Sequence, residues 1–485
     1  MAGLREGCLT FFRLSPVNDA AAQQQLFGIT RGEYEGRLDV QFYLPKHREL
    51  ERRLHSCSFP VHRVGSAEIS RQVVDGPFGS DLKVDEYVPT GVPLVRVSNC
   101  RTGQVQVDDE LVFITGEKHA ELIRSEVLPG DVLLTKAGSL GYSAVFPKEL
   151  KRGNITSHLA SIRPTEGVEP RYLSEFLSSS IGVQQIYRWG NKSTRPELNT
   201  DEVRAIEVVL PPPRRQQELV AAMDAARAQR QAKLAEADAL LAGLDGFLLA
   251  SLGLTPPPKE ERKVFAIEYK ALQGRFDPKT YLYRQHTTEK TFPYASLGSL
   301  TIKEPDYGSG SRAIERTSDE QPKYIRITDF RDDGIRPGHE FVTAETIEPE
   351  CTLQDGDVLF ARSGATAGKT FIYTQDIGLA VFAGYCIRFR FDETRVLPRF
   401  IYYFTKTTAY RQWVATIQRP SGQPNINKPE FKSFELPVPP LDAQRMIVER
   451  LNAERKKVES LRVEAEAGWQ TAKRWFEEQL LGGAK

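Results

Sequence analysis

The sequence of 485 residues has little that would place it in a membrane, in an oxidising compartment or at a metal ion. It contains no run of about 18 apolar residues, which a membrane-spanning helix needs. Its five cysteines are scattered without a Cys-x-x-Cys pair, and its seven histidines lack metal-ligand spacing. We therefore expect a cytoplasmic protein with reduced thiols and no metal site.

The sequence also lacks a strong charge of either sign. The formal net charge is +1, from 65 basic and 64 acidic residues. Many nucleic-acid-binding domains are basic, so this balance counts mildly against that class, unless acidic surface elsewhere offsets a local basic groove. The segment from Met1 to Leu14 carries Arg5 and Arg13 among few apolar residues, so we do not expect a secretory signal.

What the sequence does contain is a long internal repeat. Leu26-Phe-Gly-Ile, Gly36-Arg-Leu-Asp, Asn199 and Pro211-Pro are matched by Val264-Phe-Ala-Ile, Gly274-Arg-Phe-Asp, Asn427 and Pro439-Pro. The spacing between the copies changes from one matched segment to the next. Such length changes are typical of surface loops between shared strands, so a duplicated domain is predicted.

Matched segments in the two copies have the composition of strands. Gly130-Asp-Val-Leu-Leu-Thr-Lys-Ala-Gly corresponds to Gly356-Asp-Val-Leu-Phe-Ala-Arg-Ser-Gly, and each is a turn followed by an apolar run. Pro170 and Pro398 each open an apolar segment, as proline does at the first turn of a helix. Each domain is therefore predicted to be mixed α/β, with mostly strands and a few helices.

A long helix is predicted after each Pro-Pro pair. Apolar residues step by three and four from Leu219 to Leu248 and from Ile447 to Trp475, a coiled-coil-like pattern. Each stripe indicates core packing, and the two stripes packed on each other could also hold the two domains apart. A helix from Pro213 to Ala250 would be roughly 55 Å long.

One segment resembles a nucleotide-binding loop. Gly364-Ala-Thr-Ala-Gly-Lys-Thr370 is one residue short of the G-x-x-x-x-G-K-[ST] spacing, and its counterpart from Gly138 to Ser143 has no lysine. We expect instead a turn that presents Thr366 and Lys369 to a backbone phosphate.

No catalytic motif is complete. The tetrapeptide N/D-P-P-[FY] of amino-methyltransferases is missing, and Glu268-Tyr-Lys270 precedes Pro305-Asp306, the reverse of the nuclease order. The chain is expected to be non-catalytic.

Polar and basic residues occur in loops at matching points of both copies. Arg, Lys, Asn, Gln and Ser are the side chains that contact base edges and phosphates, although solvated loops have the same composition. Tyr87, Tyr142 and Tyr307 either support these loops or are simply packed. With the two residues of the loop above, the candidate DNA-binding residues are Ser80, Lys83, Arg96, Asn99, Lys136, Lys192, Ser193, Arg195, Ser309, Ser311, Arg312, Arg326, Arg362, Thr366, Lys369, Gln418, Arg419, Ser421, Gln423 and Asn425.

The order and duplication of these motifs resemble the specificity subunit of type I restriction-modification systems. The resemblance extends over roughly residues 26–481. Its motifs are Gly-Arg-[Leu/Phe]-Asp followed by Tyr43 or Tyr281, Asp75-Gly-Pro-Phe-Gly-Ser, the Gly-Asp-Val-Leu segments, and Gln423-Pro-Asn-Ile-Asn427 before Leu-Pro-Val-Pro-Pro-Leu-Asp-Ala-Gln444. In the first copy, Asn191-Lys-Ser-Thr-Arg-Pro-Glu-Leu-Asn199 departs from the last of these.

The resemblance implies an α+β chain with two mixed α/β target-recognition domains, separated by two long antiparallel coiled-coil helices in a pseudo-twofold arrangement. The expected parts are an N-terminal segment 1–25, a first domain 26–212, a central helix 213–253, a second domain 254–440 and a C-terminal helix 441–485. Each domain would recognise one half of an asymmetric bipartite site in double-stranded DNA.

The resemblance also implies partners. The helices would set the spacing between the half-sites and dock two methylation subunits, and restriction subunits would join the full complex. S-adenosylmethionine, ATP and Mg²⁺ would bind those partners, with no cofactor in this chain. Three alternatives stay open: the recognition subunit of a type IIB-like enzyme, a protein-interaction scaffold that binds no DNA, and an enzyme whose site has no visible motif.

Overall fold

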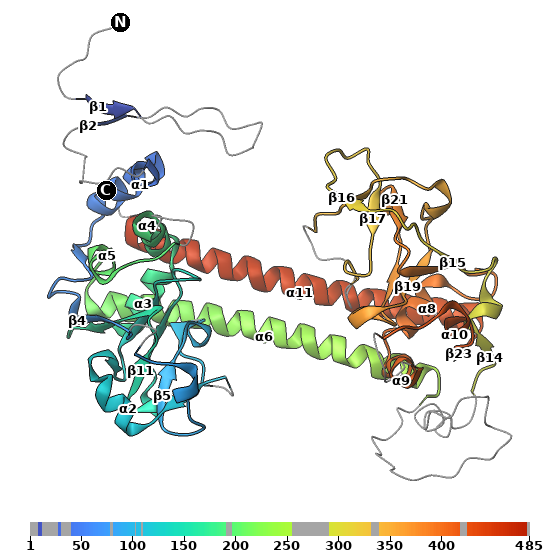
Figure 1. Ribbon diagram of the computed structural model, residues 1–485, viewed down its shortest axis with the longest axis horizontal. Helices are drawn as coiled ribbons and strands as arrows, with labels where there is room; N and C mark the ends of the chain where they lie inside the picture. The colour runs from blue at the N-terminus through green and yellow to red at the C-terminus, as the bar shows by residue number, and fades with distance from the viewer. Residues whose placement is uncertain are drawn as a thin grey trace, which may run out of the picture. The chain divides into compact units, whose positions relative to one another are not determined.

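The structure is a computed structural model (Figure 1). It describes residues 8–11, 28–30, 40–77, 81–101, 103–107, 110–190, 196–254, 291–330, 339–417 and 424–482. Among these residues, no helix is long and apolar enough to cross a membrane.

The chain divides into two compact units. Unit 1 comprises Met1–Ala232 and Ala465–Lys485, and unit 2 comprises Lys233–Glu464. The division passes through both long helices, α6 (Pro213–Ser251) and α11 (Leu441–Leu481), so each unit contains a part of each helix.

Unit 1 contains two mixed sheets and two two-stranded ladders in the described part of the chain. The strand order is β4-β12-β9-β10-β6 in the five-stranded sheet and β7-β5-β11-β8 in the four-stranded sheet. The strands are β1 (Cys8–Phe11), β2 (Gly28–Thr30), β3 (Val61–Arg63), β4 (Ser70–Asp75), β5 (Val92–Val95), β6 (Gly103–Gln104), β7 (Val112–Ile114), β8 (Glu126–Val127), β9 (Val132–Thr135), β10 (Ser143–Val145), β11 (Gly153–Ile155), β12 (Leu159–Pro164) and β13 (Glu207–Val209).

The helices of unit 1 complete its core. The central strands β9 and β12 are fully apolar on the face that packs against α3, where Tyr172 and Phe176 are fully buried. Besides the first part of α6, the helices are α1 (Pro45–Ser56), α2 (Gly116–Glu121), α3 (Pro170–Ser178), α4 (Ser180–Gly190) and α5 (Thr200–Ala205).

Unit 2 has a four-stranded sheet with the order β15-β22-β19-β20 and three two-stranded ladders. Its strands are β14 (Tyr294–Ser296), β15 (Asp306–Tyr307), β16 (Ala313–Ile314), β17 (Lys323–Ile325), β18 (Thr343–Ala344), β19 (Val358–Ala361), β20 (Thr370–Ile372), β21 (Ala380–Phe382), β22 (Cys386–Phe389) and β23 (Glu435–Pro437). Its helices, besides parts of α6 and α11, are α8 (Pro398–Phe404), α9 (Thr408–Ile417) and α10 (Lys428–Lys432).

The repeat in the sequence is a repeat in the fold. Strands β4, β12, β9 and β10 correspond in order to β15, β22, β19 and β20. Asn199 and Asn427 each cap a short helix, α5 or α10, by accepting a hydrogen bond from the backbone N–H three residues on, at 2.9 Å in both cases. The expected helix starts at Pro170 and Pro398 are also confirmed.

The two long helices pack in an antiparallel sense inside each unit. In unit 2, Ala237 of α6 is buried with Val458 and Leu461 of α11, and Glu236 pairs with Lys457 at 3.0 Å. In unit 1, Arg230 and Glu466 pair at 3.3 Å. The middle parts of the apolar stripes predicted from the sequence therefore form the helix–helix seam. Their ends, such as Leu219 and Ile447, belong to the domain cores.

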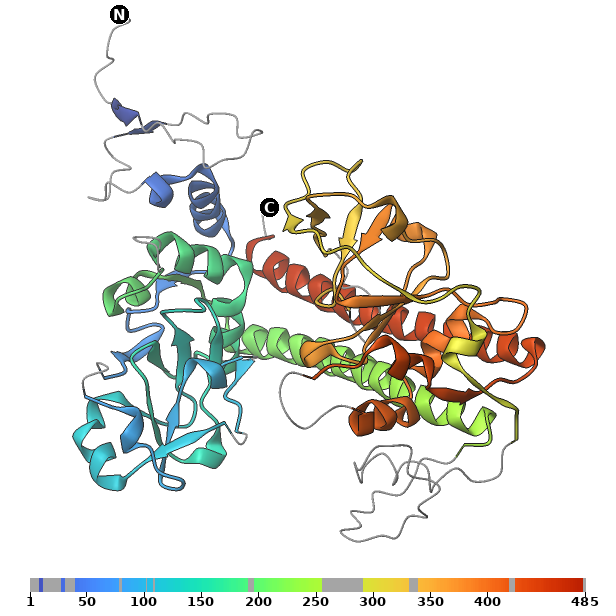
Figure 2. The same ribbon diagram turned by 45° about the vertical axis from the view of Figure 1, so that its right-hand side comes forward.

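The last turns of α11 belong to the core of unit 1. Phe476 and Leu480 are buried there, and the Glu477 carboxylate accepts a hydrogen bond of 2.7 Å from the Ser180 N–H, at the start of α4. Figures 1 and 2 both show the end of α11 (red) beside α4. The first repeat is thus completed by the helix that follows the second.

The last turns of α6 have the same role in unit 2. Leu248 and Leu252 are buried in its core, and Asp245 accepts hydrogen bonds from the Thr408 N–H and hydroxyl, at 2.9 and 2.8 Å. Thr408 begins α9, the counterpart of α4. The expected fold class, two mixed α/β domains with two long antiparallel helices, is confirmed.

Candidate nucleic-acid interface

Three chain segments meet at one edge of the main sheet in unit 1. Asp75 ends β4, Lys136 follows β9, and Thr200 is the first residue of α5. The Lys136 ammonium lies 3.3 Å from the Asp75 carboxylate, and the Thr200 hydroxyl donates to the same carboxylate at 2.5 Å. The Lys136 side chain is 9% exposed and the Asp75 side chain 30%, so a buried base is neutralised by a partly exposed acid.

The equivalent segments meet in unit 2 with different side chains. Tyr307 ends β15, Arg362 follows β19, and Lys428 is the first residue of α10. The Arg362 guanidinium lies 5.0 Å from the centroid of the Tyr307 ring, and the Lys428 ammonium lies 5.6 Å from it. Both are cation–π contacts.

Backbone hydrogen bonds show that these positions correspond. The Lys136 N–H donates to the carbonyl of His158, and its own carbonyl accepts from Leu198, each at 2.9 Å. Arg362 makes the same two bonds with Tyr385 and Ile426, at 2.9 and 2.8 Å. The framework therefore holds both basic residues in the same way, and only their side-chain partners differ.

Glu304 is the acidic group beside the second cluster. Its carboxylate lies 3.5 Å from Lys428 and 2.7 Å from Lys432. The Lys432 ammonium, followed by Lys428, holds the pKa of the Glu304 carboxyl below its usual range. One carboxylate is thus shared by two lysines, and Arg362 lies outside that pair.

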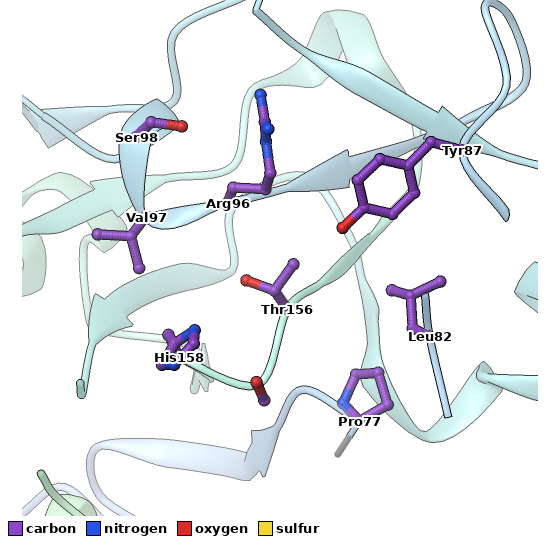
Figure 3. A pocket seen from close by; sticks show the side chains of 9 residues that line it. Pro77, Leu82, Tyr87, Arg96, Val97, Ser98, Thr156 and His158 are labelled. Atoms are coloured by element: carbon purple, nitrogen blue, oxygen red, sulfur yellow. The ribbon is translucent and has the colours of Figure 1, made fainter. Parts of the chain in front are cut away.

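A polar pocket of about 380 Å³ lies close to the first cluster (Figure 3). In Figure 3 the Tyr87 hydroxyl is directed towards the middle of the pocket, where Thr156 lies, and the Arg96 guanidinium extends away from Pro77. Arg96 donates to the Glu110 carbonyl. The lining residues are Pro77, Leu82, Tyr87, Arg96, Val97, Ser98, Thr156, Ser157 and His158.

Several of the predicted site residues form the framework. Asn99 is buried, and its side chain accepts a hydrogen bond of 3.0 Å from the Arg96 N–H. The matching bond runs from the Arg326 N–H to buried Asp329, at 2.7 Å. Ser309 is also buried, and its hydroxyl donates to Glu348 at 2.7 Å. These contacts shape the loops and leave little of Asn99 and Ser309 for a ligand.

Other predicted residues are accessible. Lys83 and Arg312 are exposed, and the Ser311 hydroxyl accepts a hydrogen bond of 2.8 Å from the Thr346 N–H. Asn425 forms an antiparallel bridge with Ser363, next to Arg362.

The loop that resembles a nucleotide-binding motif connects two strands. Thr370 begins β20, which pairs with β19, so a hairpin replaces the required strand–loop–helix unit. Thr366 contacts its own turn, through the Ser363 carbonyl at 3.5 Å. Lys369 lines a cavity of about 640 Å³ within unit 2, together with Lys406, Arg411, Arg455 and other residues of α6, α8, α9 and α11.

The remaining predicted residues lie outside the part of the chain that the structure describes. They are Ser80, Lys192, Ser193, Arg195, Gln418, Arg419, Ser421 and Gln423, together with the two Gly-Arg-[Leu/Phe]-Asp segments, Tyr281 and most of residues 1–25.

Sequence reasoning missed Asp75, Thr200 and Lys428 as members of these clusters, and it gave Tyr307 only a supporting role in a loop or simple packing. The motif Asp75-Gly-Pro-Phe-Gly-Ser contained one of them, and the capping asparagines Asn199 and Asn427 directly precede two others. Comparing the residue after each asparagine would have shown a threonine in one copy and a lysine in the other. Among the described residues, no group of three or more metal-ligating side chains converges.

Comparisons with known proteins agree with this architecture. Residues 313–464 match the family model of the type I restriction modification DNA specificity domain. The chain is 22% identical over 378 residues to the StySPI type I restriction enzyme specificity subunit of Salmonella potsdam, which covers 76% of this chain and 75% of that protein. Over 103 residues it is 32% identical to the EcoKI specificity subunit of Escherichia coli K12, covering 21% of this chain and 22% of the relative.

A solved structure shares the fold. It comes from work on complex assembly and conformational transition of the type I R-M system, and one of its chains superposes with a TM-score of 0.54 at 16% identity. The match covers 88% of this chain and 97% of the other.

Together these matches extend the resemblance from single motifs to most of the chain. Residues 313–464 match the specificity domain of type I restriction-modification systems, and the chain is similar over most of its length to the specificity subunits of these systems, which are DNA-recognition components. The alternatives of a type IIB-like recognition subunit and of a scaffold that binds no DNA are not favoured.

Proposed function

We propose that this chain recognises an asymmetric, two-part DNA sequence for a type I restriction-modification complex. The first domain, residues 26–212, contacts one half-site, and the second, residues 254–440, contacts the other. The helices 213–253 and 441–485 set the separation of the half-sites. The chain itself carries out no methyl transfer or cleavage.

The observation that carries this proposal is the combination of one framework with two sets of side chains. The backbone holds Lys136 and Arg362 through the same two hydrogen bonds. Their partners are a carboxylate, Asp75, in one copy and an aromatic ring, Tyr307, in the other. Base and phosphate contacts are made by side chains, so unlike side chains on one framework favour two different half-sites.

The repeat also supports a symmetric set of partners. Each repeat is completed by the end of the long helix that follows the other, through Ser180 and Glu477 in unit 1 and Thr408 and Asp245 in unit 2. Two similar helix–domain surfaces suit two copies of one partner. We assign these surfaces to two methylation subunits, with restriction subunits joining the full complex.

The chemistry then belongs to those partners. Adenine methylation consumes S-adenosylmethionine, and cleavage coupled to translocation requires ATP and Mg²⁺; we assign all three to the partner subunits. This chain positions the DNA relative to the partner subunits.

The modified motif in genomic DNA tests the proposal. Cells that express this chain with its methylation subunits are expected to show adenine methylation within two unlike short sequences at a fixed separation, and cells without the chain are expected to lack it. A palindromic motif, a single continuous motif, or methylation that persists without the chain would refute the proposal. Replacing residues 254–440 with those of another specificity subunit should change one half-site only.

A further inference from the structure

We propose that Tyr307, Arg362 and Lys428 form a site for DNA backbone phosphate that only the second domain possesses, and that the equivalent site of the first domain is closed by Asp75. The inference rests on the proposed DNA recognition. It specifies how the two domains differ in their contacts with the DNA backbone. It also separates Lys136 from Arg362, although both are among the candidate DNA-binding residues predicted from the sequence.

The charges of the two clusters differ although their backbones agree. In the first, Lys136 and Asp75 cancel, and Thr200 is neutral. In the second, Arg362 and Lys428 are both cations around a neutral ring. Among the described residues, the carboxylate that pairs with this cluster is that of Glu304, which is shared between Lys428 and Lys432. The second cluster therefore keeps a positive charge that a phosphate can neutralise, and the first does not.

The exposure of side chains in the two clusters agrees with this difference in charge. The Lys136 side chain is 9% exposed and points into the structure at Asp75. Tyr307 is 41% exposed, although it lies at the end of a strand of the main sheet. Tyr385, whose carbonyl accepts the hydrogen bond from the Arg362 N–H, is 64% exposed. Cations on an accessible aromatic face are placed to meet an anion from solvent.

The hydrogen-bonding capacity of Arg362 also supports a phosphate site in the second domain. Its Nε atom is buried and has no hydrogen-bond partner among the described residues. A guanidinium presents donors in a planar fork that matches two phosphate oxygens. The ring of Tyr307 supports the flat face of this group and leaves its edge for such a contact.

Phosphate contacts can be counted from the salt dependence of binding. The logarithm of the association constant falls with the logarithm of the salt concentration, with a slope of about −0.9 for each phosphate neutralised. We would measure this slope for the full chain assembled with its methylation subunits, bound to duplex DNA that contains its own methylated motif. The variants are Arg362→Gln, Lys428→Gln, their combination, Lys136→Gln, and Tyr307→Asp, which gives the second cluster the acidic group of the first.

We expect Arg362→Gln and Lys428→Gln each to flatten the slope, and the double variant to flatten it by about one to two. Tyr307→Asp should have the same effect as Arg362→Gln. Lys136→Gln should leave the slope unchanged because its charge is already neutralised by Asp75. Lys148→Gln, at an exposed lysine outside both clusters, is the matched control for a simple loss of charge.

Two outcomes overturn the inference. One is an unchanged slope in the Arg362→Gln, Lys428→Gln double variant with a melting temperature equal to that of the parent chain. The other is an equal loss of slope in Lys136→Gln and Arg362→Gln. A parent complex that shows no salt-dependent, sequence-dependent binding at all would instead refute the proposed function itself.

Discussion

Gln216 and Gln444 make the same three hydrogen bonds in the two halves of the chain. The Gln216 amide donates to the carbonyls of Pro211 and Gly167 at 2.8 and 2.9 Å, and accepts from the Glu169 N–H at 2.8 Å. Gln444 donates to the carbonyls of Pro439 and Arg395 at 2.8 and 3.1 Å, and accepts from the Leu397 N–H at 2.8 Å. Each glutamine fixes the start of a long helix to its domain.

The first prediction concerns these glutamines. Gln216→Leu and Gln444→Leu each leave three backbone groups, one buried and two part-buried, without their partner. Each variant should therefore destabilise the chain by about 2 to 4 kcal/mol. Denaturant unfolding of the purified chain measures the change. The control is Gln217→Leu, at the exposed neighbouring position. Equal effects at positions 216 and 217 would contradict the proposed role of the buried amide.

The second prediction concerns the salt dependence of stability. In unit 1 an ionic network joins α3 to α6. The two terminal guanidinium nitrogens of Arg171 donate to the Asp224 carboxylate at 2.7 and 2.5 Å, and Arg227 binds buried Glu175. Glu175→Gln breaks a pair with one buried member and should cost about 3 kcal/mol at low ionic strength. Because salt screens the partly exposed members of the network, this cost should decrease in high salt.

Unit 2 supplies the matched control for that network. The Tyr403 hydroxyl hydrogen-bonds to Asn452, and Arg455 lies over the Tyr403 ring at 5.4 Å. The Tyr403–Asn452 bond joins two uncharged groups, unlike the Arg227–Glu175 pair of unit 1. The cost of Tyr403→Phe should therefore be nearly independent of salt. Equal salt dependence of the Glu175→Gln and Tyr403→Phe variants in urea unfolding would show that the ionic network does not cause the effect.

The third prediction is a dependence of stability on pH. Burial, followed by the nearby charges of Lys46 and Arg188, lowers the pKa of His47 from 6.5 to about 4. The folded chain keeps His47 neutral, whereas the unfolded chain protonates it below pH 6.5. This contribution to stability is therefore complete above pH 6.5 and is lost as the pH falls towards 4, by about 2 to 3 kcal/mol.

His47→Leu should reduce the loss of stability between pH 6.5 and 4. Leucine suits the site because His47 is buried and its Nδ1 has no hydrogen-bond partner among the described residues. The reference variant is His55→Gln, since the His55 side chain is 62% exposed. Parallel stability curves for the parent chain and His47→Leu, from urea titrations at several pH values, would rule out a role of His47.

The fourth prediction concerns two equivalent glycines that follow Asp75 and Tyr307. A Cβ at Gly76 would lie 2.2 Å from the Thr156 carbonyl oxygen, and one at Gly308 would lie 2.3 Å from that of Phe382. Alanine at either position must displace a neighbouring strand, so each variant should lose about 1 to 3 kcal/mol of stability. Thermal unfolding provides the measurement.

Gly310→Ala is the control for Gly308→Ala. A Cβ at Gly310 would meet no atom within 4 Å, so its melting temperature should stay close to that of the parent chain. If Gly308→Ala were as stable as Gly310→Ala, the close approach of the backbones at Gly308 would not constrain the residue.

The framework could be predicted from the sequence because it depends on local patterns that occur twice. The turns at Gly130 and Gly356, the helix starts at Pro170 and Pro398, and the apolar stripes of the long helices are all short-range features. The duplication supported each of them independently. Which helix packs on which domain was not visible in these patterns.

The side-chain clusters could not be predicted in the same way. Lys136 pairs with Asp75, which is 61 residues earlier in the chain, and Thr200 joins them from a third segment. Only the folded sheet brings these positions together. A basic residue that pairs with a distant carboxylate and one that faces solvent have the same local sequence pattern, so the sequence alone placed both Lys136 and Arg362 among the candidate DNA-binding residues.

The arrangement of the last turns of α11 has a consequence for the order of folding during translation. Unit 2 is a continuous stretch of chain, Lys233–Glu464, whereas unit 1 also needs Ala465–Lys485. Phe476, Glu477 and Leu480 are therefore the last parts of the unit 1 core to leave the ribosome. The domain that is synthesised first is the one that must wait longest for its complete core, and until then the surface that α11 covers is open to chaperones and proteases.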